Sequence, residues 1–346
     1  MLNANHQPDD HTPGPGPGNE HGPGPDDDVD SALGADEPLD ALNNEDDDLV
    51  STVSLRSSIL RYRHENGRTY HAYKDGRYVL PNDAAEQDRL DLQHHLFLLT
   101  LDNRLHLCPA GPLRRALDIG TGTGIWAVDL ADEHPAASVV GVDLSPIQSP
   151  WVPPNLSFHV GDVEEPWTFR EPFDLIYSRM MTGALADWPG FFRRAYDHLG
   201  PGGWLEVADI LPITSDDGTL VEGSATREWL ARLVEAMRLL GRPIDGAALY
   251  REQMLAEGFV NVTQTVFRWP QNKWPRDRKL KELGMWNLEN ITSALHGLSS
   301  AIYTRILGWS PEELDVLLAK VRCELKDTSI HAYWPIYVVY GQRPES

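Results

Sequence analysis

Residues 116–126 read Ala-Leu-Asp-Ile-Gly-Thr-Gly-Thr-Gly-Ile-Trp, and no other stretch of the chain constrains the architecture as strongly. Its apolar start is typical of a buried parallel strand, and this strand runs directly into Gly120, Gly122 and Gly124. Glycine tolerates positive φ and lets a ligand approach the backbone closely. Residues 125–133 have a helical pattern, so the N–H groups of the loop are expected to point into a ligand crevice at the start of a helix.

A second strand and a carboxylate follow the glycine loop. Residues 138–142 form the expected strand, which ends at Asp143 and Leu144. A carboxylate about 20 residues beyond such a loop, at the edge of a parallel sheet, is placed to accept hydrogen bonds from a ribose diol. The loop and the carboxylate together predict a nucleoside-containing ligand.

The spacing of the glycines separates two nucleotide chemistries. Dinucleotide enzymes use G-x-G-x-x-G, whose last glycine allows close helix–strand packing beneath a pyrophosphate. Here the spacing is G-x-G-x-G, with Ile125 where the later glycine would stand and Asp118 just before the loop. That carboxylate disfavours a pyrophosphate but suits a cationic ligand with an ammonium and a sulfonium. The pattern Asp-x-Gly-x-Gly-x-Gly resembles motif I of class I S-adenosylmethionine methyltransferases, and a nicotinamide oxidoreductase is the weaker alternative.

The ends of the later strands supply further candidate contacts, because ligands of open parallel sheets bind beyond the carboxyl ends of the strands. Asp162 can accept from an adenine amino group while Val163 packs on the ring, or Asp162 is a turn residue that caps a local N–H. The strand end Ser178-Arg179-Met180-Met181 would line a methyl-transfer channel, with backbone groups near the methionine end of the cofactor. A structural ion pair is the alternative for Arg179. The fifth strand end, at 206–209, would face either substrate or solvent.

Strand and helix patterns alternate through the core, which predicts an α/β fold with a parallel sheet and right-handed crossovers. The expected strands are 114–119, 138–142, 156–160, 173–178 and 203–209, followed by an antiparallel pair at 260–269 and 334–340. The expected helices are 83–101, with Asn82 or Asp83 as cap and Glu86 completing a capping box, then 124–133, 188–199, 224–240 and 246–257. A helical insertion is expected over 273–327.

The first 50 residues have a composition unlike the rest of the chain. They hold 14 Asp or Glu and no Lys or Arg, which is 14 of the 22 net negative charges of the 346 residues. A segment with so little apolar surface is predicted to be disordered. We therefore expect a disordered acidic tail over 1–54 and one α/β domain over 55–346. The tail is either a solubilising appendage or a segment that binds a regulatory protein partner.

Composition also excludes several classes of function. A net charge of −22 argues against direct nucleic-acid binding, which depends on Lys and Arg. No apolar run approaches the roughly 18 residues of a membrane helix, so no membrane association is expected. Two cysteines, Cys108 and Cys323, offer neither a disulfide framework nor a zinc site, and no metal is expected. Without a signal pattern at its start, the protein is expected to be cytoplasmic or nuclear.

Residues 55–110 are expected to form a lid and a helix in front of the sheet. Within this segment, Tyr70, His71 and Tyr73 are candidates for closing over the cofactor, because aromatic faces attract a sulfonium by cation–π interaction. Packing in the core is an equal alternative for them. Three aromatic residues of the helical insertion are either core residues or an aromatic cap over the substrate: Trp286, Tyr303 and Trp309.

Longer motifs carry a resemblance to one family. The segments YRHENGRTYHAY at 62–73, LDIGTGTGIW at 117–126, GWSPEE at 308–313 and SIHAYWP at 329–335 resemble fungal LaeA-like methyltransferases. The likeness covers about residues 55–343. It implies a seven-stranded, Rossmann-like class I methyltransferase fold and S-adenosylmethionine as cofactor. The family includes a nuclear regulator of secondary metabolism that works with velvet proteins, and also small-molecule methyltransferases.

The residues and the resemblance together predict S-adenosylmethionine-dependent methyl transfer to a small molecule or a protein. Asp143 is expected to bind the ribose, Asp162 and Val163 the adenine, and the glycine loop with Asp118 the methionine end. The predicted cofactor-binding residues are Tyr70, Tyr73, Asp118, Gly120, Thr121, Gly122, Asp143, Leu144, Asp162, Val163, Ser178 and Arg179. Because an activated sulfonium needs mainly positioning and exclusion of water, no catalytic residue is predicted. The alternative function is a SAM-binding regulatory subunit of a nuclear velvet-type complex, with weak or no catalysis.

Overall fold

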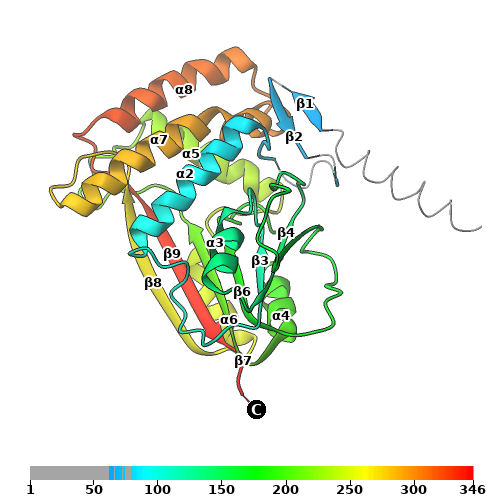
Figure 1. Cartoon of the computed structure of the whole chain (residues 1–346). Coiled ribbons are helices and arrows are strands. Elements are labelled where there is room, and N and C mark those ends of the chain that lie inside the picture. The colour runs from blue at the N-terminus through cyan, green and yellow to red at the C-terminus, as the bar shows by residue number, and fades with distance from the viewer. Residues whose placement is uncertain (1–61, 66, 72, 75–78, 346) are drawn as a thin grey trace, which may run out of the picture. The chain divides into compact units, whose positions relative to one another are not determined.

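The computed structural model describes residues 62–65, 67–71, 73–74 and 79–345, so the predicted tail over 1–54 lies outside the described residues. The described residues belong to one compact unit, Leu49–Ser346. Figure 1 labels the elements in chain order. They are β1 (Arg63–Glu65), β2 (Arg68–Tyr70), α2 (Ala84–Thr100), β3 (Arg115–Ile119), α3 (Ile125–Glu133), β4 (Ser138–Asp143), β5 (Leu156–Val160), β6 (Phe173–Arg179), α4 (Trp188–His198), β7 (Leu199–Ile210), α5 (Ala225–Leu239), η1 (Ala247–Leu249), α6 (Tyr250–Ala256), β8 (Val260–Pro270), α7 (Arg278–Ala301), η2 (Ile302–Ile306), α8 (Pro311–Lys326) and β9 (Tyr333–Gln342).

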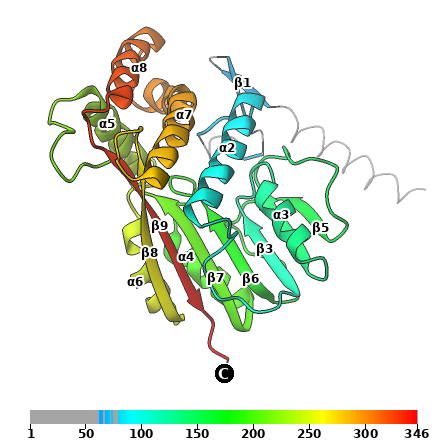
Figure 2. The same cartoon turned by 60° about the vertical axis from the view of Figure 1, so that its left-hand side comes forward.

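Among the described residues, seven strands form one mixed sheet in the order β5-β4-β3-β6-β7-β9-β8. The first five of these run parallel, and β9 is antiparallel to both β7 and β8, so the predicted parallel sheet and closing antiparallel pair are confirmed. Figure 2 shows β9 between β7 and β8. The chain leaves β3 toward β4 on one side and later returns to β6 on the other. Ligands of such sheets bind at this reversal, beyond the carboxyl ends of the strands.

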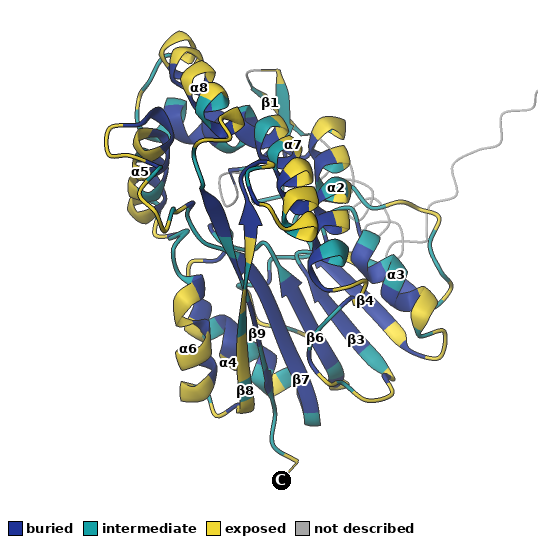
Figure 3. Ribbon diagram, turned by 90° about the vertical axis from the view of Figure 1, so that its left-hand side faces the viewer, coloured by how far each residue is buried: buried dark blue, intermediate teal, exposed yellow. Residues whose placement is uncertain are grey.

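Helices pack on both faces of the sheet. On one face α3 contributes Trp126, whose ring stacks on that of Tyr177 with the centroids 3.9 Å apart. On the other face α4 and α6 contribute the buried rings of Phe191, Phe192 and Tyr250. Large aromatic side chains bury much apolar area and therefore dominate such cores. The central strands of the sheet, β3, β6, β7 and β9, are accordingly mostly dark blue in Figure 3, whereas the residues of the edge strand β8 are exposed along much of its length.

A helical cap, which we define as α2, α5, α7 and α8, packs together at the carboxyl end of β7. Its apolar core continues into the sheet at Ala208 and Ile336. The indole N–H of Trp229 in α5 donates to Ser299 Oγ in α7 at 2.8 Å, which ties two of the cap helices together. The predicted helical insertion is present as α7, a π-helical turn at Ile302–Ile306 and α8.

Some local expectations differ from the structure. Asp83 caps α2 by accepting the N–H of Glu86 at 3.1 Å, but the Glu86 side chain pairs with Arg89 instead of returning to the cap. The helix expected over 246–257 is divided into the 3₁₀ turn η1 and α6. β7 begins earlier than expected, and a register shift against β6 accommodates its first residues, where Gly202 has a φ of +77°.

Candidate functional site

A cleft lies where the carboxyl ends of β3, β4, β5 and β6 meet, and α2 forms part of its wall. Such a position is the one that open α/β sheets use for ligands. Eight of the twelve residues predicted to contact the cofactor line this cleft: Gly120, Thr121, Gly122, Asp143, Leu144, Asp162, Val163 and Arg179. The fold thus brings together residues from four strand ends that are up to 59 positions apart in the chain.

The glycine loop after β3 has the conformation that its sequence predicts. Gly120, Gly122 and Gly124 have φ values of +71°, +57° and +85°, which other residues adopt only with strain. Beneath the loop, Thr121 Oγ1 donates to Asp118 Oδ2 at 2.6 Å. Asp118 is buried and does not line the cleft, and burial raises the pKa of its carboxyl to about 6. Asp118 therefore acts on the cleft through Thr121.

Asp143 joins the end of β4 to the glycine loop. Its Oδ2 accepts the N–H of Gly122 at 2.9 Å, and its Oδ1 accepts the N–H of Ser145 at 2.9 Å. Burial raises the pKa of this carboxyl, and the hydrogen bonds from the backbone oppose that shift. Each carboxylate oxygen has a second lone pair. Asp143 can therefore hold the loop and still accept hydrogen bonds from a ligand in the cleft.

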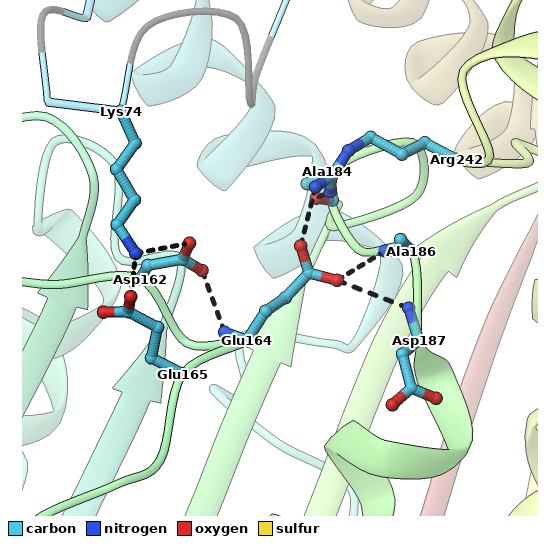
Figure 4. A network of polar contacts seen from close by, with 8 residues as sticks. All are labelled: Lys74, Asp162, Glu164, Glu165, Ala184, Ala186, Asp187 and Arg242. Atoms are coloured by element: carbon cyan, nitrogen blue, oxygen red, sulfur yellow. Dashed lines mark hydrogen bonds and ion pairs between the residues drawn. The ribbon is translucent and has the colours of Figure 1, made fainter.

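Asp162 lies in a network of charged side chains at the mouth of the cleft (Figure 4). Its Oδ1 accepts the N–H of Glu164 at 2.9 Å, and its Oδ2 lies 3.3 Å from Lys74 Nζ. Lys74 also pairs with Glu165. Glu164 in turn pairs with Arg242 at 2.7 Å, and Arg242 lines the cleft. Lys74 thus forms an ion pair with the residue that is the predicted adenine contact.

Arg179 at the end of β6 is held by α2. Its Nη2 donates to His94 Nδ1 at 3.0 Å, and His94 Nε2 lies 2.8 Å from Asp129 Oδ2. Since a guanidinium cannot accept a hydrogen bond, the imidazole accepts at Nδ1 and donates from Nε2. Burial, together with the charge of Arg179, lowers the pKa of His94 to about 4. Arg179 is therefore hydrogen-bonded to a neutral histidine, and its positive charge in the cleft is not shared with a second cation.

Besides Asp118, three further predicted cofactor contacts do not line the cleft. Ser178 is fully buried, because consecutive residues of a strand point to opposite faces and Arg179 takes the side of the cleft. Tyr70 belongs to the apolar core of the cap, with the Arg305 guanidinium 4.9 Å from its ring centroid. The ring of Tyr73 has Lys74 Nζ 5.7 Å from its centroid. For Tyr70, the alternative of core packing describes its surroundings.

The expectation that the end of β7 faces substrate or solvent is wrong, because Glu206 and Asp209 are both 0% exposed. Glu206 accepts the N–H groups of Leu107 at 2.7 Å and Cys108 at 2.6 Å, so it anchors the loop after α2. Burial raises its pKa to about 7. The side-chain atoms of His106, Cys108 and Glu206 that could bind a metal ion lie within 4.8 Å of one another. The hydrogen bonds from the loop already explain why the carboxylate of Glu206 is buried here.

Asp209 has a structural partner of its own. The hydroxyl of Tyr250 in α6 donates to Asp209 Oδ2 at 2.9 Å, and the N–H of Ile210 donates to Oδ1 at 3.1 Å. Burial raises the pKa of this carboxyl to about 7 as well. The sequence reasoning assumed that a polar residue at a strand end faces outward. In β7, a central strand of the sheet, the side chains are covered on both faces.

The aromatic residues of the helical insertion are not part of the cleft wall. Tyr303 is fully buried, and its ring lies edge-on to that of Trp309 with the centroids 5.2 Å apart. Trp286 is 41% exposed and contacts the ring of His95. Tyr303 is therefore a packed core residue and does not cover the cleft.

The cleft also contains residues that the sequence reasoning missed. They come from α2 and are Glu86, Leu90 and Gln93, whereas Met180 and Met181, which also line the cleft, belong to the strand end at 178–181 that was predicted to face it. The α2 residues recur at intervals of three or four, which is the spacing of one helix face. That face could have been found from periodicity, but the fact that it faces the strand ends could not.

Comparison with known proteins gives the family. A family model described as a methyltransferase domain matches residues 92–264. Methyltransferase pytC of Aspergillus terreus is 43% identical over 297 residues, which cover 85% of this chain and 92% of that protein. The chain belongs to the LaeA-like methyltransferase family.

Other members of the LaeA-like family are also similar over most of this chain. Probable methyltransferase tdiE of Emericella nidulans is 38% identical over 304 residues, which cover 86% of this chain and 93% of that protein. Secondary metabolism regulator laeA of Aspergillus fumigatus is 37% identical over 284 residues, which cover 81% of this chain and 76% of that protein. Of the described helices, none is both long and apolar enough to cross a membrane.

This LaeA-like protein is an S-adenosylmethionine-dependent methyltransferase, and the cleft fits that cofactor. Among the residues that line it, Asp143 and Asp162 are carboxylates and Arg179 is a guanidinium. At Gly120 an added Cβ would lie 2.2 Å from Met181 Sδ, so the absence of a side chain lets Met181 pack directly against the loop backbone. S-adenosylmethionine supplies an electrophilic methyl group on a sulfonium. What the chain must add is orientation and exclusion of water.

Proposed function

We propose that the cleft binds S-adenosylmethionine with its ribose at Asp143, its adenine at Asp162 and Val163, and its methionine end at the glycine loop. The observation that carries this proposal is the hydrogen bond of 2.9 Å between Gly122 N–H and Asp143 Oδ2. It joins the loop to the carboxylate, so the two contacts act as one rigid surface. Preorganised surfaces bind tightly because little conformational freedom is lost on binding.

The methionine end of the cofactor carries both an ammonium and a carboxylate, and the cleft has a group for each. Arg179 lines the cleft with its guanidinium oriented by His94, which suits the carboxylate. Asp118 lies under the loop and supports Thr121, and its carboxylate adds negative potential for the ammonium and sulfonium. Leu144 and Val163 supply apolar surface for the adenosine. These roles refine the predicted set without adding a catalytic base.

The test is calorimetric titration of the full chain with S-adenosylmethionine. We expect Asp143→Ala to weaken binding about 10- to 100-fold, because hydrogen bonds to a charged acceptor contribute roughly 1.5–3 kcal/mol. Asp132→Ala is the matched control, since Asp132 is an exposed carboxylate on α3 outside the cleft, and its affinity should equal that of the wild type. Equal affinity of Asp143→Ala and Asp132→Ala would contradict the assignment.

A second candidate function rests on the similarity to secondary metabolism regulators. In this view the chain binds the cofactor and acts through a protein partner, in the nucleus or the cytoplasm. The acidic segment at 1–50 is the candidate partner-binding element. Deletion of that segment should abolish capture of the partner and leave cofactor binding unchanged. Methyl transfer by the deleted chain, with the partner still captured, would favour the enzyme alone.

A further inference from the structure

A second cavity lies inside the helical cap, next to the cofactor cleft. α2, α5 and α7 contribute to its wall, together with the segments after β6 and β7. It holds about 980 Å³ of space, including space open to solvent, which is within the range of sites for small ligands. In contrast to the cleft, none of the described residues in its wall is a carboxylate.

The surface of this cap cavity is almost entirely apolar. Aliphatic side chains such as Leu233, Ile291 and Leu298 form most of it, and the indoles of Trp229 and Trp334 add aromatic faces. Both indole N–H groups are already used, since they donate to Ser299 and Gln271. The indoles therefore present carbon surface to the cavity. An apolar occupant would gain free energy from leaving water here, whereas the polar backbone groups of a peptide would lose their hydrogen bonds to water.

Among the described residues of the cap cavity wall, Arg89 is the one guanidinium, and its charge is neutralised. Arg89 pairs with Glu86 at 2.6 Å and donates to Asn290 Oδ1 at 2.8 Å. A charge that is paired in this way is not available to balance an ionic ligand. The cavity therefore favours a neutral molecule over an anion or a cation.

Three residues line both the cofactor cleft and the cap cavity, namely Leu90, Gln93 and Met180. They mark the junction at which a group in the cap cavity would meet a group in the cleft. Met180 has a φ of +55°, although it is not a glycine, and its N–H donates to Ala208 O at 2.8 Å. Strained backbone of this kind is concentrated at functional sites.

Gln93 is the polar group at this junction. It is 5% exposed, yet among the residues that the structure describes none forms a hydrogen bond with its side-chain amide. Buried amides are normally paired, because an unpaired one costs about 1–3 kcal/mol. The Gln93 amide is therefore available to a ligand, as acceptor through its oxygen and as donor through its nitrogen.

We infer that the methyl acceptor is a neutral, largely apolar small molecule whose body lies in the cap cavity and whose hydroxyl or amine binds the Gln93 amide. This rests on the proposed binding of the cofactor in the cleft. The lone pair of the acceptor oxygen or nitrogen forms the bond to the methyl carbon while the carbon–sulfur bond breaks toward sulfur. The proton of the hydroxyl or amine passes to water. Gln93 is a positioning residue, since an amide does not take up that proton.

The probe for this inference is 2-naphthol, a planar apolar molecule with one hydroxyl, and its comparison compound is naphthalene, which lacks the hydroxyl. Calorimetric titrations use the full chain saturated with S-adenosylhomocysteine. We expect the wild type to bind 2-naphthol several-fold more tightly than naphthalene. In Gln93→Leu that preference should disappear while naphthalene affinity is kept, because only the hydrogen bond is lost. A purely structural role of Gln93 would change both affinities alike.

Variants that fill the cap cavity provide a second test of the inference. Leu298→Trp enlarges a half-buried side chain of the wall and should weaken both naphthyl probes at least tenfold, with S-adenosylhomocysteine affinity unchanged. Ala294→Phe is a second filling variant in case the first does not fold. Val316→Trp, at a 61% exposed position of α8, is the matched control and should bind like the wild type.

The outcomes separate this inference from the proposal on which it rests. If S-adenosylhomocysteine does not bind to the folded wild type, the proposed function fails. If S-adenosylhomocysteine binds to the wild type but 2-naphthol does not, the acceptor inference is overturned. It is also overturned if 2-naphthol binds to Leu298→Trp and Ala294→Phe as tightly as to the wild type. Methylation of protein or peptide side chains by a variant with a filled cavity would also overturn it.

Discussion

The cofactor cleft and the cap cavity share three residues, but they are built in opposite ways. Most of the cleft wall comes from short loops between residues 120 and 185, with glycines, carboxylates and backbone N–H groups. The wall of the cap cavity comes from apolar side chains spread between Val79 and Trp334. A ligand that is the same throughout a family can be recognised by fixed backbone geometry. A ligand that differs between members is recognised by side chains that can be replaced one at a time.

A matched pair of leucine substitutions tests whether the two regions are separate. Leu117 in β3 and Leu318 in α8 are both fully buried. Each Leu→Ala change should lower the free energy of unfolding by about 2–5 kcal/mol, through lost burial and the cavity left behind. Only Leu117→Ala, directly before the glycine loop, should weaken S-adenosylhomocysteine binding. Thermal denaturation and calorimetry measure the two effects, and a weaker cofactor affinity in Leu318→Ala would show that cap and cleft act as one.

A matched pair of glycine substitutions examines the rigid side of the comparison. Gly124 and Gly218 have φ values of +85° and +73°, so alanine is strained at both. An added Cβ would lie 2.4 Å from the Phe158 ring at Gly124 but in open space at Gly218. We expect Gly124→Ala to cost about 1–3 kcal/mol more in free energy of unfolding than Gly218→Ala, the usual cost of overpacking. If denaturant titrations gave equal losses in the free energy of unfolding for the two variants, the glycine loop would have to shift to accommodate the added methyl group.

The smallest expected effect concerns the link between Arg179 and α2. His94→Leu removes the acceptor of the Arg179 Nη2 hydrogen bond, and S-adenosylmethionine affinity at pH 7.5 should fall about fivefold, which corresponds to roughly 1 kcal/mol. His95→Leu, at the exposed neighbouring position, is the control and should leave the affinity unchanged. An unchanged affinity in His94→Leu would show that Arg179 needs no support from α2.

The same variant has a signature in pH. The pKa of His94 is lowered to about 4 in the folded protein, whereas a histidine of the unfolded chain titrates near its ordinary pKa of 6.5. As the pH falls from about 6.5 to 4, the unfolded chain takes up a proton that the folded chain does not, so the contribution of His94 to stability is lost in this window. His94→Leu should therefore show a smaller loss of stability than His95→Leu between pH 6.5 and 4 in denaturant titrations.

The sequence predicted the cofactor side of the molecule better than the acceptor side. Asp143, Asp162 and the glycines lie in short segments whose role follows from strand ends and backbone freedom, and the parallel sheet follows from the alternation of strands and helices. Gln93 belongs to no motif, and its exposure to both cavities depends on how α2 docks against the strand ends. Such docking is decided by contacts between distant segments, which one sequence does not display.

The two wrong or incomplete expectations about strand ends have a common physical origin. Both expectations rest on the idea that side chains at the carboxyl end of a strand reach the ligand. Ser178 differs from Arg179 because alternation along β6 turns it toward the interior. Glu206 and Asp209 are covered because β7 is a central strand, with a loop on one side and Tyr250 on the other. The position of a strand within the sheet, and not its end alone, decides which side chains are accessible.

The double role of α2 has a consequence for how such enzymes diversify. Leu90 and Gln93, on one face of this helix, border both cavities, whereas Ile291 and Leu298 of α7 border the cap cavity alone. Substitutions that accumulate on α7 can thus adapt the protein to new acceptors at no loss of cofactor affinity. Substitutions on that face of α2 change both affinities together. In a lineage that acquires new substrates, variation is therefore expected to concentrate on α5 and α7, while the inner face of α2 changes last.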